Sequence, residues 1–266
     1  MLHRGGGQPR VTWDKVIVTG GDTVKVGSYY FKLDSKTYKL AYSTREKSGF
    51  KRTPMANYST FVHGKTAYYA SSGKLYRFNL GSGKKAALKS LGKDASRVGA
   101  VRGSYVYVNC AGEFTNTSGS EVYVKAYDTK TGTLSTAAKG FWIEDVGGAY
   151  AVGRAHTITD VSPRERYVYK IGGAKLSKLR TIAKYGYSCR YVGGKLYFSS
   201  SKDVGMKETS LMRANPDGTG AECLATWKGR NIVVVLSYAE DSCTVSLDAK
   251  DYRFTYDTGE FVELAS

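Results

Sequence analysis

The sequence predicts an all-β fold, a single six-bladed β-propeller built from four-stranded antiparallel blades. Three observations predict it. A glycine-centred turn recurs at intervals of 37 to 46 residues, a spacing typical of propeller blades rather than of helical repeats. Each turn precedes a run of aromatic and β-branched residues, which suit a pleated, half-buried surface. Long stretches with apolar residues at helical spacing are absent from the sequence, so we expect almost no helix.

The recurring turn follows the first strand of each unit, and a second turn follows the third strand. The markers of the first turn are Gly27, Gly64, Gly103, Gly148, Gly194 and the pair Glu240-Asp241. Six copies in which both turns repeat are hard to attribute to chance in a glycine-rich chain. The predicted blades are residues 22–56, 57–91, 95–140, 141–184, 185–227 and 231–264 of one domain that spans residues 11–266.

The fifth unit shows the pattern most clearly. Four short strands are separated by turns in which Gly193-Gly194 and Asp217-Gly218 supply the positive φ angles that tight hairpins need. Such a sheet cannot bury both faces alone, so it must stack on other sheets. Radial repetition provides those neighbours and leaves only short, protected edges.

The segment Leu211 to Gly220, with Gly194 to Phe198 before it, resembles blades of six-bladed propellers of the TolB-like and low-density-lipoprotein-receptor type. The similarity is greatest to uncharacterised bacterial surface-associated propellers, and it extends in weaker form over residues 22–264. The Tyr-Trp-Thr-Asp motif of the receptor group is missing. The resemblance therefore implies a fold and an exported protein, and it carries no receptor-type ligand to this chain.

The start of the chain allows two arrangements. We expect residues 1–10 to be a disordered tail because they are rich in glycine and charge. Val11 to Thr19 reads as a strand, which we expect to pair with the last blade and help to close the ring. If residues 11–21 instead belong to an extra partial blade, the propeller has seven blades.

The net charge of +17, from 40 basic and 23 acidic residues, predicts attraction to polyanions. The lysines are spread over many turns, whereas nucleic-acid readers concentrate positive charge on one face or carry a recognisable motif. We therefore favour anionic wall polymers, acidic polysaccharides or proteins as partners over nucleic acid. Nothing in the sequence indicates an oligomer, and we expect a monomer.

The four cysteines, Cys110, Cys189, Cys223 and Cys243, show no Cys-x-x-Cys spacing, so we expect no metal and no cofactor. Buried thiols are the main expectation, with a disulfide as the alternative.

No signal peptide is evident in the first ten residues, and no apolar run is long enough for a membrane span. The chain is then either cytoplasmic or the exported part of a longer protein. The resemblance favours the second, at the cell surface or otherwise outside the cytoplasm.

Function is expected where the loops are long. The link between second and third strands is long in three consecutive units, at Asn109–Ser120, Gly153–Glu165 and Ser199–Thr209. In a propeller these links share a face with the crossovers between blades, so they should build one raised sector. The candidate ligand-binding residues on this face are Tyr58, Arg97, Trp142, Glu144, Asp145, Arg154, His156, Asp160, Tyr187, Asp203, Trp227 and Arg230.

Aromatic residues interleaved with arginine suit the recognition of sugars, peptides or acidic groups. The alternative is that the aromatic residues only fill the wedge-shaped gaps between blades.

Catalysis has weak support in the sequence. A Gly-x-Ser-x-Gly elbow is absent, and His156 near Asp160 is the one histidine in a setting that suits acid-base chemistry. A pair of carboxylates such as Glu144 and Asp145 could serve a glycosidase if their separation were right. We therefore expect a non-catalytic binding or interaction module. The alternatives are a propeller-type polysaccharide or ester hydrolase or lyase, and a basic nucleic-acid-binding protein.

Overall fold

The computed structural model describes residues 14–18, 21–92, 94–112, 121–155, 165–205, 207–229, 232–235, 241–248 and 250–264. These residues form strands and turns, and no helix occurs among them. The described residues therefore contain no helix that could cross a membrane. The chain divides into two compact units, one of residues 1–110 and 126–135 and the other of residues 111–125 and 136–266. Residues 1–10, the predicted tail, lie outside the described residues.

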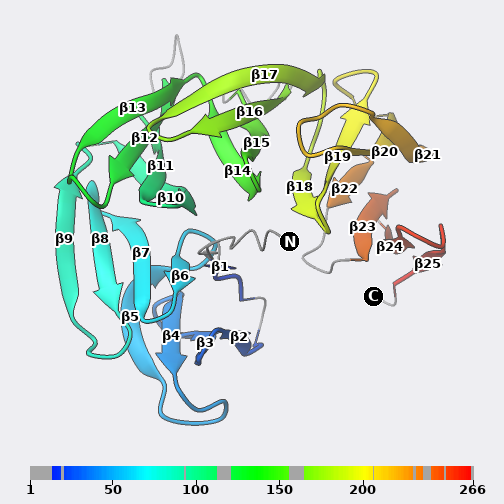
Figure 1. Ribbon diagram of the computed structural model, residues 1–266. Coiled ribbons are helices and arrows are strands. Elements are labelled where there is room, and N and C mark those ends of the chain that lie inside the picture. The colour runs from blue at the N-terminus through cyan, green and yellow to red at the C-terminus, as the bar shows by residue number, and fades with distance from the viewer. Residues whose placement is uncertain are drawn as a thin grey trace, which may run out of the picture. The chain divides into compact units, whose positions relative to one another are not determined.

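The strands form six antiparallel sheets in chain order (Figure 1). The first sheet is β2 (Val24–Val26), β3 (Tyr29–Leu33), β4 (Lys39–Ser43) and β5 (Lys51–Ala56). The second is β6 (Phe61–His63), β7 (Thr66–Ser71), β8 (Lys74–Asn79) and β9 (Lys85–Ser90), extended by β1 (Asp14–Lys15). The third is β10 (Ala95–Arg102), β11 (Tyr105–Ala111), β12 (Val122–Asp128) and β13 (Leu134–Lys139).

The fourth sheet is β14 (Trp142–Gly147), β15 (Tyr150–Arg154), β16 (Arg166–Gly172) and β17 (Lys175–Ala183). The fifth is β18 (Cys189–Val192), β19 (Lys195–Ser201), β20 (Glu208–Ala214) and β21 (Glu222–Lys228). The sixth is β22 (Val233–Val235), β23 (Ser242–Leu247), β24 (Lys250–Thr255) and β25 (Phe261–Glu263). Six successive four-stranded meanders are the blades of a six-bladed β-propeller fold, so the predicted fold class is confirmed.

The marker glycines adopt the conformation that the hairpins need. Gly27, Gly64, Gly103 and Gly148 have φ between 55° and 58°, in the left-handed region that glycine enters at no steric cost. The sequence signal that defined the blades is therefore a backbone requirement of their first turn.

The predicted pairing of the N-terminal strand with the last blade is wrong. β1 pairs with β6 of the second sheet, Asp14 opposite Val62 and Lys15 opposite Phe61. The side-chain amide of Asn57 accepts a hydrogen bond from the Val18 N–H (3.0 Å) and donates one to the Val18 carbonyl (2.7 Å). This bidentate contact explains the pairing, because it holds the segment beside the second blade. The described residues between 11 and 21 contribute one two-residue strand and no extra blade, which removes the seven-bladed alternative.

Two predicted loops are shorter than expected. β11 continues to Ala111 and buries Asn109, and β19 continues to Ser201 with Ser199 fully buried. Their polar residues suggested loops in the sequence. In the structure these residues lie in strands, where neighbouring polar groups form hydrogen bonds with them. For example, Ser201 Oγ forms a 2.6 Å hydrogen bond with Thr209 Oγ1.

Close packing in the fourth blade requires a glycine at position 153. A Cβ atom there would lie 2.0 Å from the Trp142 carbonyl oxygen and 2.9 Å from the Phe141 ring. At Gly172 in the same sheet, a Cβ atom would meet only the Lys175 carbonyl oxygen, at 3.7 Å.

We predict that Gly153→Ala lowers the free energy of unfolding by about 3 kcal/mol, because the clash is with backbone that must move. Gly172→Ala, the control, should change it by less than about 1 kcal/mol. Urea denaturation of the two variants measures the difference. Equal effects would show that the close approach at Gly153 does not exist.

Tyrosine dominates the aromatic content of the buried strands, and burial changes its titration. Tyr69 and Tyr107 are each 1% exposed, and removal from water raises the pKa of both to about 12. In the unfolded chain a tyrosine ionises near pH 10.

Between about pH 10 and pH 12 the unfolded chain therefore binds fewer protons than the folded protein. We predict that stability is unaffected by these two groups below pH 10 and falls above it, by about 1.4 kcal/mol for each tyrosine at pH 11. Urea denaturation between pH 9 and pH 11 tests this, and Tyr69→Phe should flatten part of the decline. A stability that stays constant over this range would contradict the prediction.

Candidate functional site

The candidate site lies at one edge of the fourth and fifth sheets, in the unit that holds residues 136–266. In the fourth sheet Trp142 lies opposite Arg154, Arg154 opposite Arg166 and Arg166 opposite Ala183. The start of β14, the end of β15, the start of β16 and the end of β17 therefore share this edge. The crossover from β17 to β18 leaves from the same edge, as the sequence predicted for the loop face.

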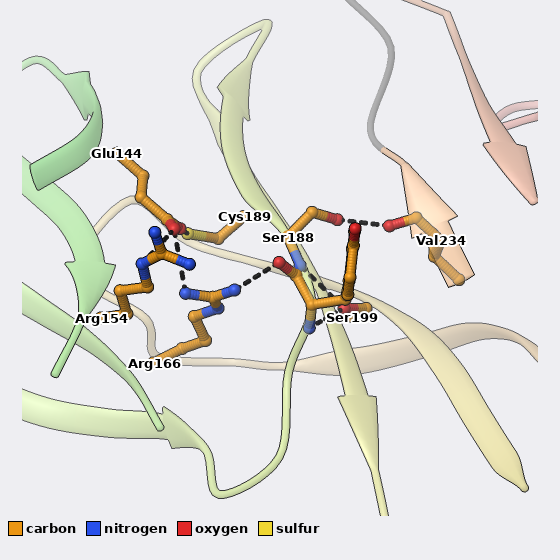
Figure 2. Close-up of polar contacts among 8 residues, drawn as sticks. Glu144, Arg154, Arg166, Ser188, Cys189, Ser199 and Val234 are labelled. Atoms are coloured by element: carbon orange, nitrogen blue, oxygen red, sulfur yellow. Dashed lines mark hydrogen bonds and ion pairs between the residues drawn. The ribbon is translucent and has the colours of Figure 1, made fainter. Parts of the chain in front are cut away.

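A fully buried arginine organises this edge (Figure 2). Arg166 is 0% exposed and is the largest fully buried side chain among the described residues. Its Nη1 donates to Glu144 Oε1 at 3.0 Å, and its Nη2 donates to the carbonyl oxygen of Tyr187. A buried guanidinium is tolerated only where its charge is paired and hydrogen-bonded. These two contacts pair the charge and bond both terminal nitrogens, while Nε is buried without a hydrogen-bond partner among the described residues.

Glu144 is held at both oxygens. Its Oε1 also lies 3.3 Å from Nε of Arg154, while its Oε2 accepts a hydrogen bond from the Cys189 thiol at 2.9 Å. Figure 2 shows the two arginines and the cysteine converging on this one carboxylate from β15, β16 and β18. Glu144 thus joins the inner strands of two adjacent blades.

A β-bulge in β14 sets the direction of the Glu144 side chain. Ile143 pairs with Gly153 and Asp145 pairs with Val152, so Glu144 is the extra residue of β14. Asp145, the next residue, also reaches β18, where its Oδ2 accepts the Tyr191 N–H at 2.8 Å. In a regular strand consecutive side chains point to opposite faces, and the bulge lets both carboxylates contact the same neighbouring strand.

Cys189 is buried, and its environment keeps the thiol protonated. Burial, together with the negative charge of Glu144, raises the pKa of Cys189 well above its ordinary value. A thiol becomes a nucleophile or metal ligand only as the thiolate. Cys189 therefore acts as a hydrogen-bond donor in this site. None of the four cysteines forms a disulfide, so the disulfide alternative is wrong.

The backbone at Tyr187 is fixed from two sides, although its side chain is 37% exposed. Ser199 Oγ accepts the N–H of Tyr187 at 2.8 Å and the N–H of Ser188 at 3.1 Å. Arg166 binds the Tyr187 carbonyl from the other side, and Ser188 Oγ donates to the carbonyl of Val234 in the sixth blade at 2.6 Å (Figure 2). The crossover therefore presents an exposed aromatic ring from a rigid backbone.

The structure brings together four of the predicted residues. Glu144, Asp145, Arg154 and Tyr187 belong to the contact network around Arg166 and β18, and Trp142 is the register partner of Arg154. Asp203 is exposed in the link between β19 and β20.

The other predicted residues lie elsewhere. Tyr58 and Arg97 belong to the other compact unit, in the turn after β5 and on β10. Trp227 packs against the rings of Phe254 and Phe261 in the sixth blade, at 5.4 and 5.7 Å between centroids. For Trp227, packing between blades is therefore the correct interpretation. His156, Asp160 and Arg230 lie outside the described residues.

Sequence reasoning missed Arg166, Cys189 and Ser199. Arg166 opens an otherwise apolar strand, Arg166-Tyr167-Val168-Tyr169, where an arginine reads as the exposed end of the strand. The structure shows instead that Arg166 and the next three residues are all buried, which the residue types alone do not indicate for an arginine.

Solved structures of other proteins share this fold. An oligogalacturonate lyase in complex with manganese matches with a TM-score of 0.60 and 13% identity, over 90% of this chain and 74% of that protein. A prolyl endopeptidase matches with a TM-score of 0.63 and 10% identity, over 92% of this chain and 42% of the peptidase. At these identities the likenesses show the fold alone.

A putative TolB from Agrobacterium tumefaciens matches at 15% identity over 76% of this chain and 77% of that protein, but its TM-score of 0.46 is too low to support an argument. No family model matches the chain, and no curated protein matches its sequence. Membership of the TolB-like group therefore stays a prediction beyond the propeller fold itself.

The buried ion pair yields a prediction. Glu144→Leu leaves the buried Arg166 guanidinium without this carboxylate, and we expect a loss of about 3 kcal/mol of unfolding free energy. The double variant Glu144→Leu with Arg166→Met should lose less than Glu144→Leu alone, because no buried charge remains uncompensated.

Glu222→Leu is the control, since the Glu222 carboxylate pairs with Arg213 at 2.7 Å on an exposed surface. It should cost less than about 1 kcal/mol. Denaturant unfolding of the four proteins gives the comparison. A loss in the double variant as large as that in Glu144→Leu, or larger, would contradict the dependence of Arg166 on Glu144.

Proposed function

We propose that this propeller is a non-catalytic binding module that recognises an acidic carbohydrate at the edge formed by the fourth and fifth blades. The observation that carries the proposal is the rigid presentation of Tyr187. Tyr187 is 37% exposed while its carbonyl and N–H are held by Arg166 and Ser199. Binding to an aromatic side chain that is already ordered costs less conformational entropy than binding to a mobile one.

Charge supports an anionic ligand. The Arg154 side chain is 27% exposed beside the buried Arg166, and the whole chain carries a net charge of +17. An arginine and an exposed tyrosine on the same edge suit a sugar with a carboxylate, because the ring can pack on the sugar face while the guanidinium binds the carboxylate in bidentate fashion. A protein partner with an acidic surface is compatible with the same features.

The resemblance of the sequence to exported propellers supports a location outside the cytoplasm. This assignment, like the monomeric state, stays a prediction. Nucleic acid is the third candidate partner, and it predicts a steep fall of affinity with salt.

The enzyme alternative takes its support from the likeness to the lyase. That protein binds manganese, but among the described residues no three His, Cys, Asp or Glu side chains converge on a possible metal site. Glu144 is engaged at both oxygens and Cys189 is held as a thiol, so these donors do not fit a metal. We derive no reaction step through a metal from these residues.

Binding to polygalacturonate, an acidic polymer of sugar rings, tests the proposal against neutral dextran at low and high salt. We predict that Arg154→Ala and Tyr187→Ala each weaken polygalacturonate binding about tenfold, a loss of about 1.4 kcal/mol in binding free energy. Arg77→Ala removes one positive charge from an exposed position in the other unit and should change affinity less than about twofold.

The wild-type protein should retain measurable binding at high salt because stacking contributes beside charge. Equal losses in all three variants would point to bulk charge and contradict the proposed site. Release of unsaturated or reducing ends from the polymer, abolished in Glu144→Gln, would favour the enzyme alternative.

A further inference from the structure

Two bulky residues adopt a backbone conformation that their side chains disfavour. Among the described residues, four other than glycine have positive φ: Tyr38 (53°), Tyr58 (63°), Ser72 (48°) and Asp248 (50°). Aspartate enters this region several times more often than most residues, and serine is small, whereas a bulky residue there is a true outlier. The two tyrosines therefore occupy positions that stability alone would not assign to them.

Other turns of the same chain show which residue that backbone favours. The Tyr38 N–H donates to the Asp34 carbonyl at 2.8 Å, four residues earlier. The same contact recurs in three other turns, with donor to acceptor distances of 2.7 to 3.0 Å, and the donors there are Gly83, Gly132 and Gly259. All three have positive φ. Tyr38 thus stands where the other turns use glycine.

Both tyrosines leave the first sheet at the same edge. Lys39 of β4 is the register partner of Ala56 of β5. Tyr38 directly precedes Lys39, and Tyr58 follows Ala56 by two residues, so the two rings emerge beside one paired position. Tyr38 is 77% exposed and Tyr58 is 41% exposed.

The backbone beneath both rings is fixed. Asp34 Oδ1 accepts the N–H and the hydroxyl of Thr37, each at 2.9 Å, and Asp34 Oδ2 pairs with Arg52 Nε at 2.7 Å. The Arg52 guanidinium lowers the pKa of Asp34 to about 2, so the turn keeps its ion pair at neutral pH. The Tyr58 N–H donates to the Val16 carbonyl at 3.2 Å.

Exposed positive charge lies beside Tyr38. Lys36 lies within the same turn as Tyr38, Lys39 follows it, and both lysines are exposed. Two exposed rings with lysines beside them suit a chain of sugar rings that carries carboxylates. The rings can stack on the apolar faces of successive sugars while the ammonium groups bind the acids.

We propose that Tyr38 and Tyr58, with Lys36 and Lys39, form a second binding site for an acidic polysaccharide on the first blade. The site shares its ligand class with the proposed function but uses none of the residues around Arg166. It belongs to the other compact unit, so each site can be lost without the other.

The strain supplies a sharp test, because glycine at these positions relieves the backbone while removing the ring. Tyr38→Gly and Tyr58→Gly should each raise or preserve the urea denaturation midpoint and weaken polygalacturonate binding about fivefold to tenfold, because each variant loses one exposed ring that the ligand would stack on. Ser72→Gly is the matched control: it relieves a positive φ at an exposed position of the same unit and should leave binding unchanged.

Repeating the variants in the Tyr187→Ala background separates the two sites. If both sites exist, binding that survives in Tyr187→Ala falls further with Tyr38→Gly. If only the first-blade site exists, Tyr187→Ala has no effect and the two glycine variants still lose affinity. Wild-type affinity in both glycine variants, or a wild-type protein that does not bind polygalacturonate, would overturn the inference. Dextran binding that falls equally in the glycine variants would overturn the acidic character of the ligand.

Discussion

The buried charge of Arg166 is the constraint on which the loop edge of the fourth and fifth blades depends. A guanidinium excluded from water needs a carboxylate and further acceptors, and here they come from two separate segments, Glu144 on β14 and the carbonyl of Tyr187 on the crossover. Arg166 therefore links the first strand of the fourth blade to the crossover that enters the fifth. Cys189 strengthens this junction by donating to the second oxygen of Glu144.

The local irregularities of the fourth blade follow from this requirement. A regular β14 would send Glu144 and Asp145 to opposite faces, and the bulge brings both to β18. The price is a close approach of backbone to backbone that leaves room only for glycine at position 153. Gly186 is needed in the same way, because a Cβ atom there would lie 2.7 Å from the Ser199 carbonyl oxygen and 2.9 Å from Cγ of Arg166.

The sequence was sufficient for the blades because their first turn needs left-handed backbone, which only glycine supplies freely, as at Gly27 and Gly148. The sequence was insufficient for the N-terminal segment. There the Asn57 side chain forms two hydrogen bonds with the Val18 backbone and holds the segment beside the second blade. Glu144, Arg154 and Tyr187 could be placed on the loop edge from strand order alone. Arg166 could not, since the carboxylate that pairs with it is oriented by a bulge in β14, two strands away, and this bulge leaves no periodic signal.

The exposed tyrosines of the two proposed binding sites are held in place by different interactions. Tyr187 is presented from a backbone held by a buried ion pair, which a well-packed apolar substitute could often replace without loss of stability. Tyr38 and Tyr58 are presented from left-handed backbone, where glycine would be less strained. In each case an unusual local feature, a buried ion pair or a bulky residue in left-handed backbone, lies directly beneath an exposed ring. Departures of this kind from local rules concentrate at functional surfaces, which is why we propose that both sites contact a ligand.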